Sequence, residues 1–208
     1  MTVAPLTTPP PRRDTPEGWR EHPFWTELFG HSGPVEIEIG PGDGTFLLAA
    51  AARHPATNFL GIERSRAKAR RLAARIARLG TPRIRMLHAD ATCVLAHLVP
   101  SGSVQAVHAY FPDPWPKRRH TRRRIFTADA IAALAAALAP GGPLHVATDV
   151  HEYACVIRAR VLASGLFTED AVDAAHPGLD SAFARKYRRA GRALHPASFL
   201  RRPSTDVC

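Results

Sequence analysis

The sequence is poor in cysteine and in long apolar runs, and each shortage excludes a class of protein. Its 208 residues include 3 cysteines, Cys93, Cys155 and Cys208, without Cys-x-x-Cys or paired histidine spacing. Neither a disulfide framework nor a zinc site is indicated, and we expect no metal. No apolar run approaches the roughly 20 residues of a membrane span, and the N-terminus lacks the apolar core of a secretion signal. We therefore expect a cytoplasmic protein with no membrane partner.

Acidic residues are also scarce relative to basic ones. The chain has 18 Asp and Glu against 28 Lys and Arg, a formal net charge of +10. This excess favours a nucleic acid partner, with an acidic membrane surface as the competing explanation. Residues 1–22 are rich in proline and polar residues and predict a flexible arm. The length suits one domain, which we place at residues 23–208.

Apolar patterns along the chain predict a doubly wound α/β domain. Strands are expected at 35–39, 58–62, 83–88, 104–111, 144–147 and near 197–201, and helices at 23–30, 45–53, 65–79, 127–138 and 151–164. A strand, a glycine-rich turn and a helix form the first unit of such folds. We expect a mostly parallel sheet of about seven strands with helices on both faces.

The turn after the first strand discriminates between two cofactor classes. It reads Gly40-Pro41-Gly42-Asp43-Gly44, whereas a dinucleotide fingerprint would be Gly-x-Gly-x-x-Gly. Acids stand at the ends of three successive strands, at Glu38, Glu63 and Asp90. S-adenosylmethionine presents an ammonium, a ribose and an adenine but no pyrophosphate, so it matches these acids better than an anionic ligand. Each acid taken alone could instead cap a helix or lie on the surface.

Residues 108–124 join one constrained carboxylate to a run of cations. Pro112 and Pro114 flank Asp113, and because proline holds φ near about −65°, this loop should be stiff. Trp115 could stack on a planar base or pack its own loop. The segment then carries Lys117, Arg118, Arg119, Arg122, Arg123 and Arg124. A phosphate backbone would bind these cations, with a solvated basic loop as the alternative.

Five motifs resemble those of the tRNA (guanine-N7)-methyltransferases. They are Glu-Ile-Gly-x-Gly-x-Gly at 38–44, Gly-Ile-Glu at 61–63, Phe-Pro-Asp-Pro-Trp-Pro-Lys at 111–117, Pro-Gly-Gly at 140–142 and Ala-Thr-Asp at 147–149. The similarity covers residues 34–202. It implies a Rossmann-like class I methyltransferase that uses S-adenosylmethionine to methylate N7 of a guanine in the tRNA variable loop, position 46 in conventional tRNA numbering.

The resemblance also implies roles for individual residues. The cofactor side would comprise Glu38, Gly40, Gly42, Glu63, Asp90, Ala91 and Asp113, with Asp113 also the active-site acid. The nucleotide side would comprise Lys117, Asp149, Ser181 and Phe183, and the arginines Arg122, Arg123 and Arg124 would bind phosphates, as would the cluster at 185–192. The tail departs from the family at Ala184, where an acid is usual. Either another acid compensates, or activity is weaker, or the substrate guanine differs.

Guanine N7 has a lone pair and no proton, so its methylation needs no base to activate it. Catalysis should rest on alignment and electrostatics, with the Asp113 carboxylate favouring the charge that develops on the purine. Two alternatives remain: a methyltransferase for another RNA guanine or for a protein, and an RNA-binding protein that kept the fold without catalysis. The expected partner is tRNA, and both monomer and homodimer stay open.

Overall fold

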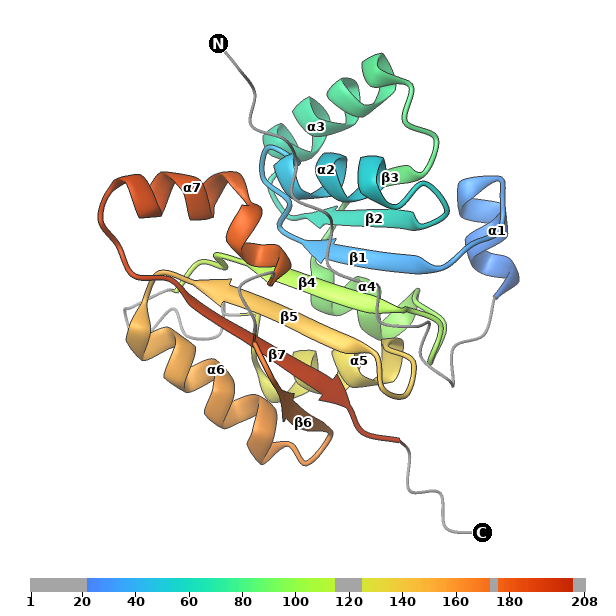
Figure 1. Ribbon diagram of the computed structural model, residues 1–208. Coiled ribbons are helices and arrows are strands. Elements are labelled where there is room, and N and C mark those ends of the chain that lie inside the picture. The colour runs from blue at the N-terminus through green and yellow to red at the C-terminus, as the bar shows by residue number, and fades with distance from the viewer. Residues whose placement is uncertain (1–21, 115–124, 173–175, 204–208) are drawn as a thin grey trace, which may run out of the picture.

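The computed structural model describes residues 22–114, 125–172 and 176–203. Within these residues, seven strands form one sheet in the order β3-β2-β1-β4-β5-β7-β6 (Figure 1). The strands are β1 (Val35–Ile39), β2 (Asn58–Glu63), β3 (Ile84–His88), β4 (Ala106–Tyr110), β5 (Pro143–Thr148), β6 (Phe167–Asp170) and β7 (His195–Arg201). This order confirms the predicted doubly wound α/β fold. All but the last residue of the predicted arm lies outside the described residues.

The strand directions mark the place where such a sheet binds ligands. Strands β1 to β5 pair in parallel, whereas β7 runs antiparallel to both β5 and β6. The chain moves outward from β1 through β2 to β3 and then returns to the other side of β1 for β4 and β5. The order thus reverses between β1 and β4. Open α/β sheets bind ligands at such a reversal, outside the carboxyl ends of the strands.

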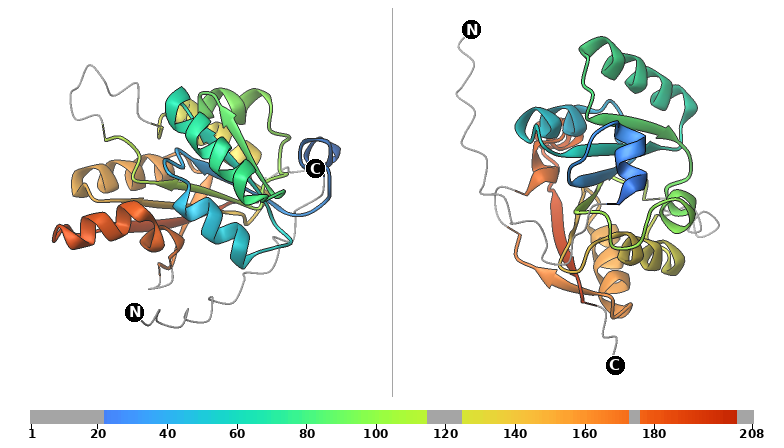
Figure 2. Two further views of the ribbon diagram at one scale, coloured as in Figure 1. Left: turned by 90° about the horizontal axis from the view of Figure 1, so that it is seen from above. Right: turned by 90° about the vertical axis from the view of Figure 1, so that its right-hand side faces the viewer.

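Helices cover both faces of the sheet, as predicted (Figure 2). They are α1 (Pro23–Phe29), α2 (Thr45–Arg53), α3 (Arg66–Leu79), α4 (Ala91–His97), α5 (Ala128–Ala137), α6 (His151–Ala163), α7 (Ala182–Arg189) and the 3-10 helix η2 (Pro177–Asp180). One apolar core joins α1, α4, α5 and α6 to one face of the sheet. A second joins α2 and α3 to the other face.

Local signals in the sequence account for several element ends. Helix α2 has the predicted bounds. Helix α5 begins after Thr127, whose hydroxyl accepts a hydrogen bond from the Ala130 N–H at 3.3 Å. Strand β4 is shorter than the predicted 104–111. Val104 forms only an isolated bridge to Leu138, and Phe111 leaves the sheet with a φ of 51°.

Four elements were not predicted: α4, β6, η2 and α7. Helix α4 is 7 residues long and begins after Asp90, whose carboxylate accepts hydrogen bonds from the N–H groups of Thr92 and Cys93. A helix this short has too few residues to show a helical period in the apolar pattern of the sequence. Helix α7 is only 8 residues long and rich in cations, so the sequence indicated a basic cluster there rather than a helix. Among the described residues, no helix is both long and apolar enough to cross a membrane.

Candidate functional site

The glycine turn between β1 and α2 has a backbone that only glycine adopts easily. Gly40, Gly42 and Gly44 have φ values of 68°, 60° and 76°, in the left-handed region that other residues avoid. The Gly40 N–H donates to the Ile62 carbonyl at 2.8 Å, which ties the turn to β2. A Cβ on Gly44 would overlap a methyl carbon of Leu72 in α3. The turn therefore brings bare backbone to the carboxyl ends of β1 and β2.

Glu38 lies buried two residues before this turn. The residue is only 4% exposed, and within the described residues its Oε2 atom has no hydrogen-bond partner. Burial raises the pKa of Glu38 well above its usual range, and the negative charges of Asp43 and Glu63 raise it further, against a hydrogen bond from the backbone of Leu47. A buried carboxylate oxygen without a partner is costly to the fold. Ligand hydroxyl or ammonium groups could satisfy it.

The other two predicted acids stand at the ends of the neighbouring strands. Glu63 is buried at the end of β2, and its Oε1 accepts a hydrogen bond from the Ser65 N–H at 2.7 Å. Asp90 is exposed after β3 and caps α4 through one oxygen, and Ala91 is the first residue of that helix. Asp90 therefore does cap a helix, as the alternative interpretation expected. It also lies close to the end of the strand that carries Glu63. Parallel pairing of β1, β2 and β3 brings all three acids to one edge of the sheet.

The loop after β4 begins with a strained residue. Phe111 is the one residue other than glycine with positive φ among those described, and it precedes a proline. Its N–H donates to the Ala147 carbonyl at 2.7 Å, so β5 holds the strained backbone in place. Such strain persists only where the surroundings impose it, and it is frequent at functional sites. Asp113 follows two residues later and is exposed.

Helix α7 packs against both the glycine turn and this loop. The Phe183 ring lies over Gly42, with its Cε2 atom 3.1 Å from where a Cβ would stand. The Phe111 ring centroid is 6.1 Å from that of Phe183 and 5.3 Å from that of Tyr187. Ser181 is buried, and its hydroxyl caps α7 by accepting a hydrogen bond from the Ala184 N–H at 3.1 Å. Ser181 and Phe183, which the sequence assigned to nucleotide binding, therefore lie at a helix that contacts both the glycine turn and the loop of Asp113.

Asp149 is held by Arg192, a residue of the 185–192 cluster that the sequence assigned to phosphates rather than to an ion pair. Arg192 Nη1 lies 2.5 Å from Asp149 Oδ2, and the aspartate side chain is 9% exposed. The same guanidinium lies 5.0 Å from the centroid of the Tyr187 ring. Burial and the charge of Asp149 raise the pKa of the Tyr187 phenol, Arg192 opposes this, and Asp113 adds to it. Tyr187 therefore lies within electrostatic reach of both acids.

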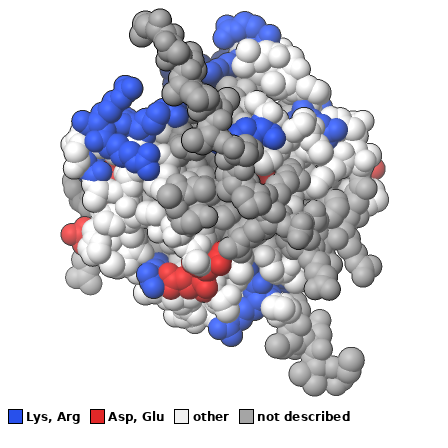
Figure 3. All heavy atoms as spheres, viewed as in Figure 1, with Lys and Arg blue, Asp and Glu red and all other residues white. Residues whose placement is uncertain are grey.

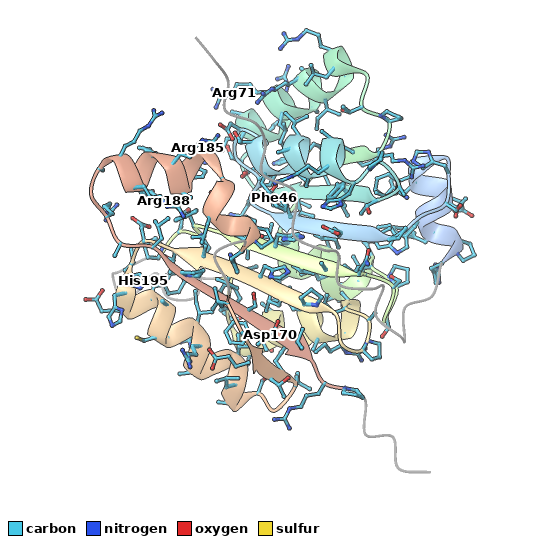
Figure 4. All side chains as sticks on the ribbon, viewed as in Figure 1. Phe46, Arg71, Asp170, Arg185, Arg188 and His195 are labelled. Carbon is cyan, nitrogen blue, oxygen red and sulfur yellow. The ribbon has the colours of Figure 1, made fainter. Side chains whose placement is uncertain are left out.

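A buried network of hydrogen bonds holds Tyr110, the residue before Phe111. His108 Nδ1 is 2.7 Å from the Tyr110 hydroxyl, and His108 Nε2 is 2.9 Å from Glu36. Burial, with the charges of Glu38 and Glu36, raises the pKa of Tyr110, so this phenol stays protonated and can donate to the histidine. Phe46 of α2 packs on the same two rings (Figure 4). Sequence reasoning missed this network because Glu36 lies 72 residues before His108.

Several predicted residues cannot be placed. Lys117, Arg122, Arg123 and Arg124, together with Trp115, lie outside the described residues. In the described ranges, no cluster of three or more His, Cys, Asp or Glu residues could hold a metal ion.

Residues 32–196 match the family model Methyltransf_4, described as "Putative methyltransferase". The chain belongs to this methyltransferase family. The matched region includes the glycine turn, the strand-end acids and the loop after β4.

Several relatives of the chain are named as enzymes that act on tRNA. The tRNA (guanine-N(7)-)-methyltransferase of Alkalilimnicola ehrlichii is 45% identical over 126 residues, which cover 61% of this chain and 53% of that protein. The enzyme of the same name from Nocardia farcinica is 41% identical over 179 residues, 80% of this chain and 66% of that protein. The matched part of the chain thus spans between about half and two thirds of these relatives. The resemblance read from the motifs is confirmed.

Solved structures agree on the fold. The 16S rRNA methyltransferase KamB superposes with a TM-score of 0.64 at 16% identity, covering 86% of this chain and 93% of that one. A SAM-dependent methyltransferase from Aquifex aeolicus gives 0.58 at 10% identity, covering 85% and 87%. At such low identity these neighbours establish the methyltransferase fold alone.

Proposed function

We propose that this chain transfers a methyl group from S-adenosylmethionine to N7 of a guanine in tRNA, at position 46 of the variable loop in conventional tRNA numbering. The observation that carries the cofactor assignment is the buried, partnerless oxygen of Glu38 beside the glycine turn. An anionic pyrophosphate would be repelled by Glu38, Glu63 and Asp90, whereas ammonium and hydroxyl groups would satisfy them. The names of the relatives support guanine N7 in tRNA as the target.

Each described site residue receives a role in this proposal. Glu38 and Glu63 would accept hydrogen bonds from donors of the cofactor, Asp90 and Ala91 would line the same site, and Gly40 and Gly42 would let the backbone approach it. When bound, the cofactor supplies an electrophilic methyl group on a sulfonium. Phe183 closes the site over Gly42. The residues of this edge therefore align the methyl group with the incoming base.

Asp113 is the proposed catalytic residue. The purine gains positive charge as its N7 lone pair takes the methyl group, and a nearby carboxylate stabilises that charge more than it stabilises the neutral base. Asp113 can also accept hydrogen bonds from guanine N1–H and the exocyclic amine, which adenine cannot match. Asp149 is held by Arg192, and its charge acts on Tyr187, as the charge of Asp113 does. Because N7 carries no proton, no general base is needed.

Mapping the methylated nucleotide tests this function. Unmodified tRNA incubated with the protein and methyl-labelled S-adenosylmethionine should carry the label at N7 of the variable-loop guanine. Asp113→Asn should lower kcat by about 10²-fold or more, whereas Asp129→Asn, the same change at an exposed site on α5, should leave it intact. Full activity of Asp113→Asn with unchanged cofactor binding would refute the role of the carboxylate.

A methyltransferase for a different RNA guanine is the second candidate. Ala184 stands where the resembled family has an acid, and it is fully buried in α7. Label at another guanine would favour this candidate, and absence of cofactor binding would favour a non-catalytic RNA-binding protein. A tRNA substrate also implies a cytoplasmic site of action, in accord with the expectation from the sequence.

A further inference from the structure

Helix α3 carries six cations and no acid. Its buried face consists of Ala69, Leu72 and Ile76. All other positions of the helix are exposed. The cations are Arg66, Lys68, Arg70, Arg71, Arg75 and Arg78. The helix therefore has a narrow apolar face toward the core and a broad, positively charged exposed face.

The charges of α3 are arranged against the stability of the helix. Arg66 and Lys68 lie in its first turn, beside the positive end of the helix dipole. Arg66 precedes Arg70, and Arg71 precedes Arg75, at the four-residue spacing where like charges repel. In the part of the chain that the structure describes, only Arg75 among these six forms a hydrogen bond or ion pair. A bound polyanion would relieve this repulsion.

The helix is anchored beside the candidate site. Arg75 Nη1 donates to the Asp43 carbonyl of the glycine turn at 2.9 Å, and Leu72 packs under Gly44. Phe183 of α7 covers Gly42 of the same turn. The turn thus lies between two basic helices, α3 and α7.

The figures show the two groups of cations at one end of the molecule. Blue atoms lie over α7 at the left and over α3 at the top (Figure 3). Arg71 of α3 and Arg185 of α7 project from the two helices that flank the turn (Figure 4).

We propose that α3 is a third phosphate-binding surface for the RNA substrate, separate from the cation run at 117–124 and from α7. This inference rests on the proposed function. A helix of 14 residues is about 21 Å long at 1.5 Å per residue, enough to follow several phosphates. Such contacts contribute affinity and register but little sequence information. The surface would hold the RNA on the cofactor side while α7 holds it on the base side.

The packing of α3 favours RNA over an anionic membrane. A helix that binds a membrane surface needs an apolar face free to enter the lipid. The apolar residues of α3 are instead committed to the core, and its one exposed large apolar residue is Leu79 at the C-terminal end. The cations that remain can neutralise phosphates without insertion.

Two matched double variants test the surface. Arg70→Gln/Arg71→Gln removes two exposed cations from α3. The control, Arg158→Gln/Arg202→Gln, removes two exposed cations from α6 and from the position after β7, elements of the opposite core. It also breaks the surface ion pair of Arg158 with Glu169. Binding of unmodified tRNA is measured between about 50 and 200 mM salt. The α3 variant should reduce the slope of log K against log salt by about 1.5 and weaken binding about tenfold at the lower salt, whereas the control should match wild type.

The outcomes are distinguishable. An unchanged slope in the α3 variant, or an equal loss in the control, would overturn the proposal. If the salt slope of tRNA binding is unchanged but the α3 variant loses binding to phosphatidylserine vesicles, the proposal is also overturned, and α3 is a membrane-binding surface. The α3 variant should unfold at no lower temperature than wild type, because like charges are removed. Binding requires no turnover, so a wild-type protein that binds tRNA but does not methylate it would refute the proposed function alone.

Discussion

Glu38 shows at the scale of one residue how a binding site costs stability. Its carboxyl pKa is raised above the ordinary value of 4.5, chiefly by burial. Between that value and the raised one, the folded state binds more protons than the unfolded state. Stability is therefore highest below about 4.5 and falls as pH rises through the folded pKa. Under the proposed function, this cost is retained because the carboxylate binds the cofactor.

Glu38→Gln should raise the free energy of unfolding of the ligand-free protein by about 1 kcal/mol at pH 8. The gain should vanish at pH 4, where the carboxyl is protonated in both states. Urea unfolding at the two pH values measures it. Glu152→Gln, the same change at an exposed position in the first turn of α6, should raise neither value, because a carboxylate there interacts favourably with the helix dipole. A loss of stability at pH 8 in Glu38→Gln would contradict the assignment of a destabilising buried charge.

The turn between β1 and α2 is the element on which the site depends. Its glycines are required for different physical reasons. Gly40 and Gly44 share a left-handed backbone, with φ of 68° and 76°. A Cβ on Gly40 would meet nothing within 4 Å, whereas one on Gly44 would overlap the buried Leu72. The two positions therefore separate backbone strain from overpacking.

Gly40→Ala should destabilise the protein by about 1 kcal/mol from the left-handed backbone alone. Gly44→Ala should lose about 1–3 kcal/mol more, because Leu72 must move within the core. Chemical denaturation of the two variants side by side compares these costs. Equal losses of stability in the two variants would mean that Leu72 moves without cost and that packing against α3 does not hold the turn in place.

At the scale of the whole molecule, the site joins parts distant in sequence. Strand-end residues of β1, β2 and β4, together with α7 from near the C-terminus, surround the glycine turn. A ligand bound across this edge contacts only the folded chain. Ligand binding and global stability should therefore be linked.

S-adenosylmethionine at about 100 times its Kd should stabilise the fold by about 2.7 kcal/mol. For a protein of this size that corresponds to a rise in Tm of about 5–10 °C. A thermal melt with and without the cofactor measures the shift. It should disappear in Glu38→Gln and persist in Glu152→Gln. A shift retained in Glu38→Gln would place the cofactor elsewhere.

Local patterns in the sequence were enough to predict most of the parallel sheet. Alternation in residues 35–39 and the helical stretch 45–53 specify β1 and α2 without help from the rest of the chain. The acids Glu38 and Glu63 were expected to meet because parallel strands bring their carboxyl ends to one edge. Strand-end acids and glycine spacing were thus enough to predict a cofactor site at that edge.

Other parts of the site depend on contacts that no local pattern records. The Asp149–Arg192 pair joins residues 43 positions apart and Glu36–His108 joins residues 72 apart. Helix α7 is short and its sequence is mostly basic, so nothing local to it indicates that the rings of Phe183 and Tyr187 pack on Phe111.

The sequence by itself determined the fold class, the glycine turn and the chemistry available at the strand ends, because these follow from periodicity and residue type over short windows. Only the tertiary structure decided that α7 closes over the turn, that Arg192 engages Asp149, and that the cations of α3 flank the same turn. Those arrangements arise from side-chain packing between distant segments, which sequence spacing does not encode.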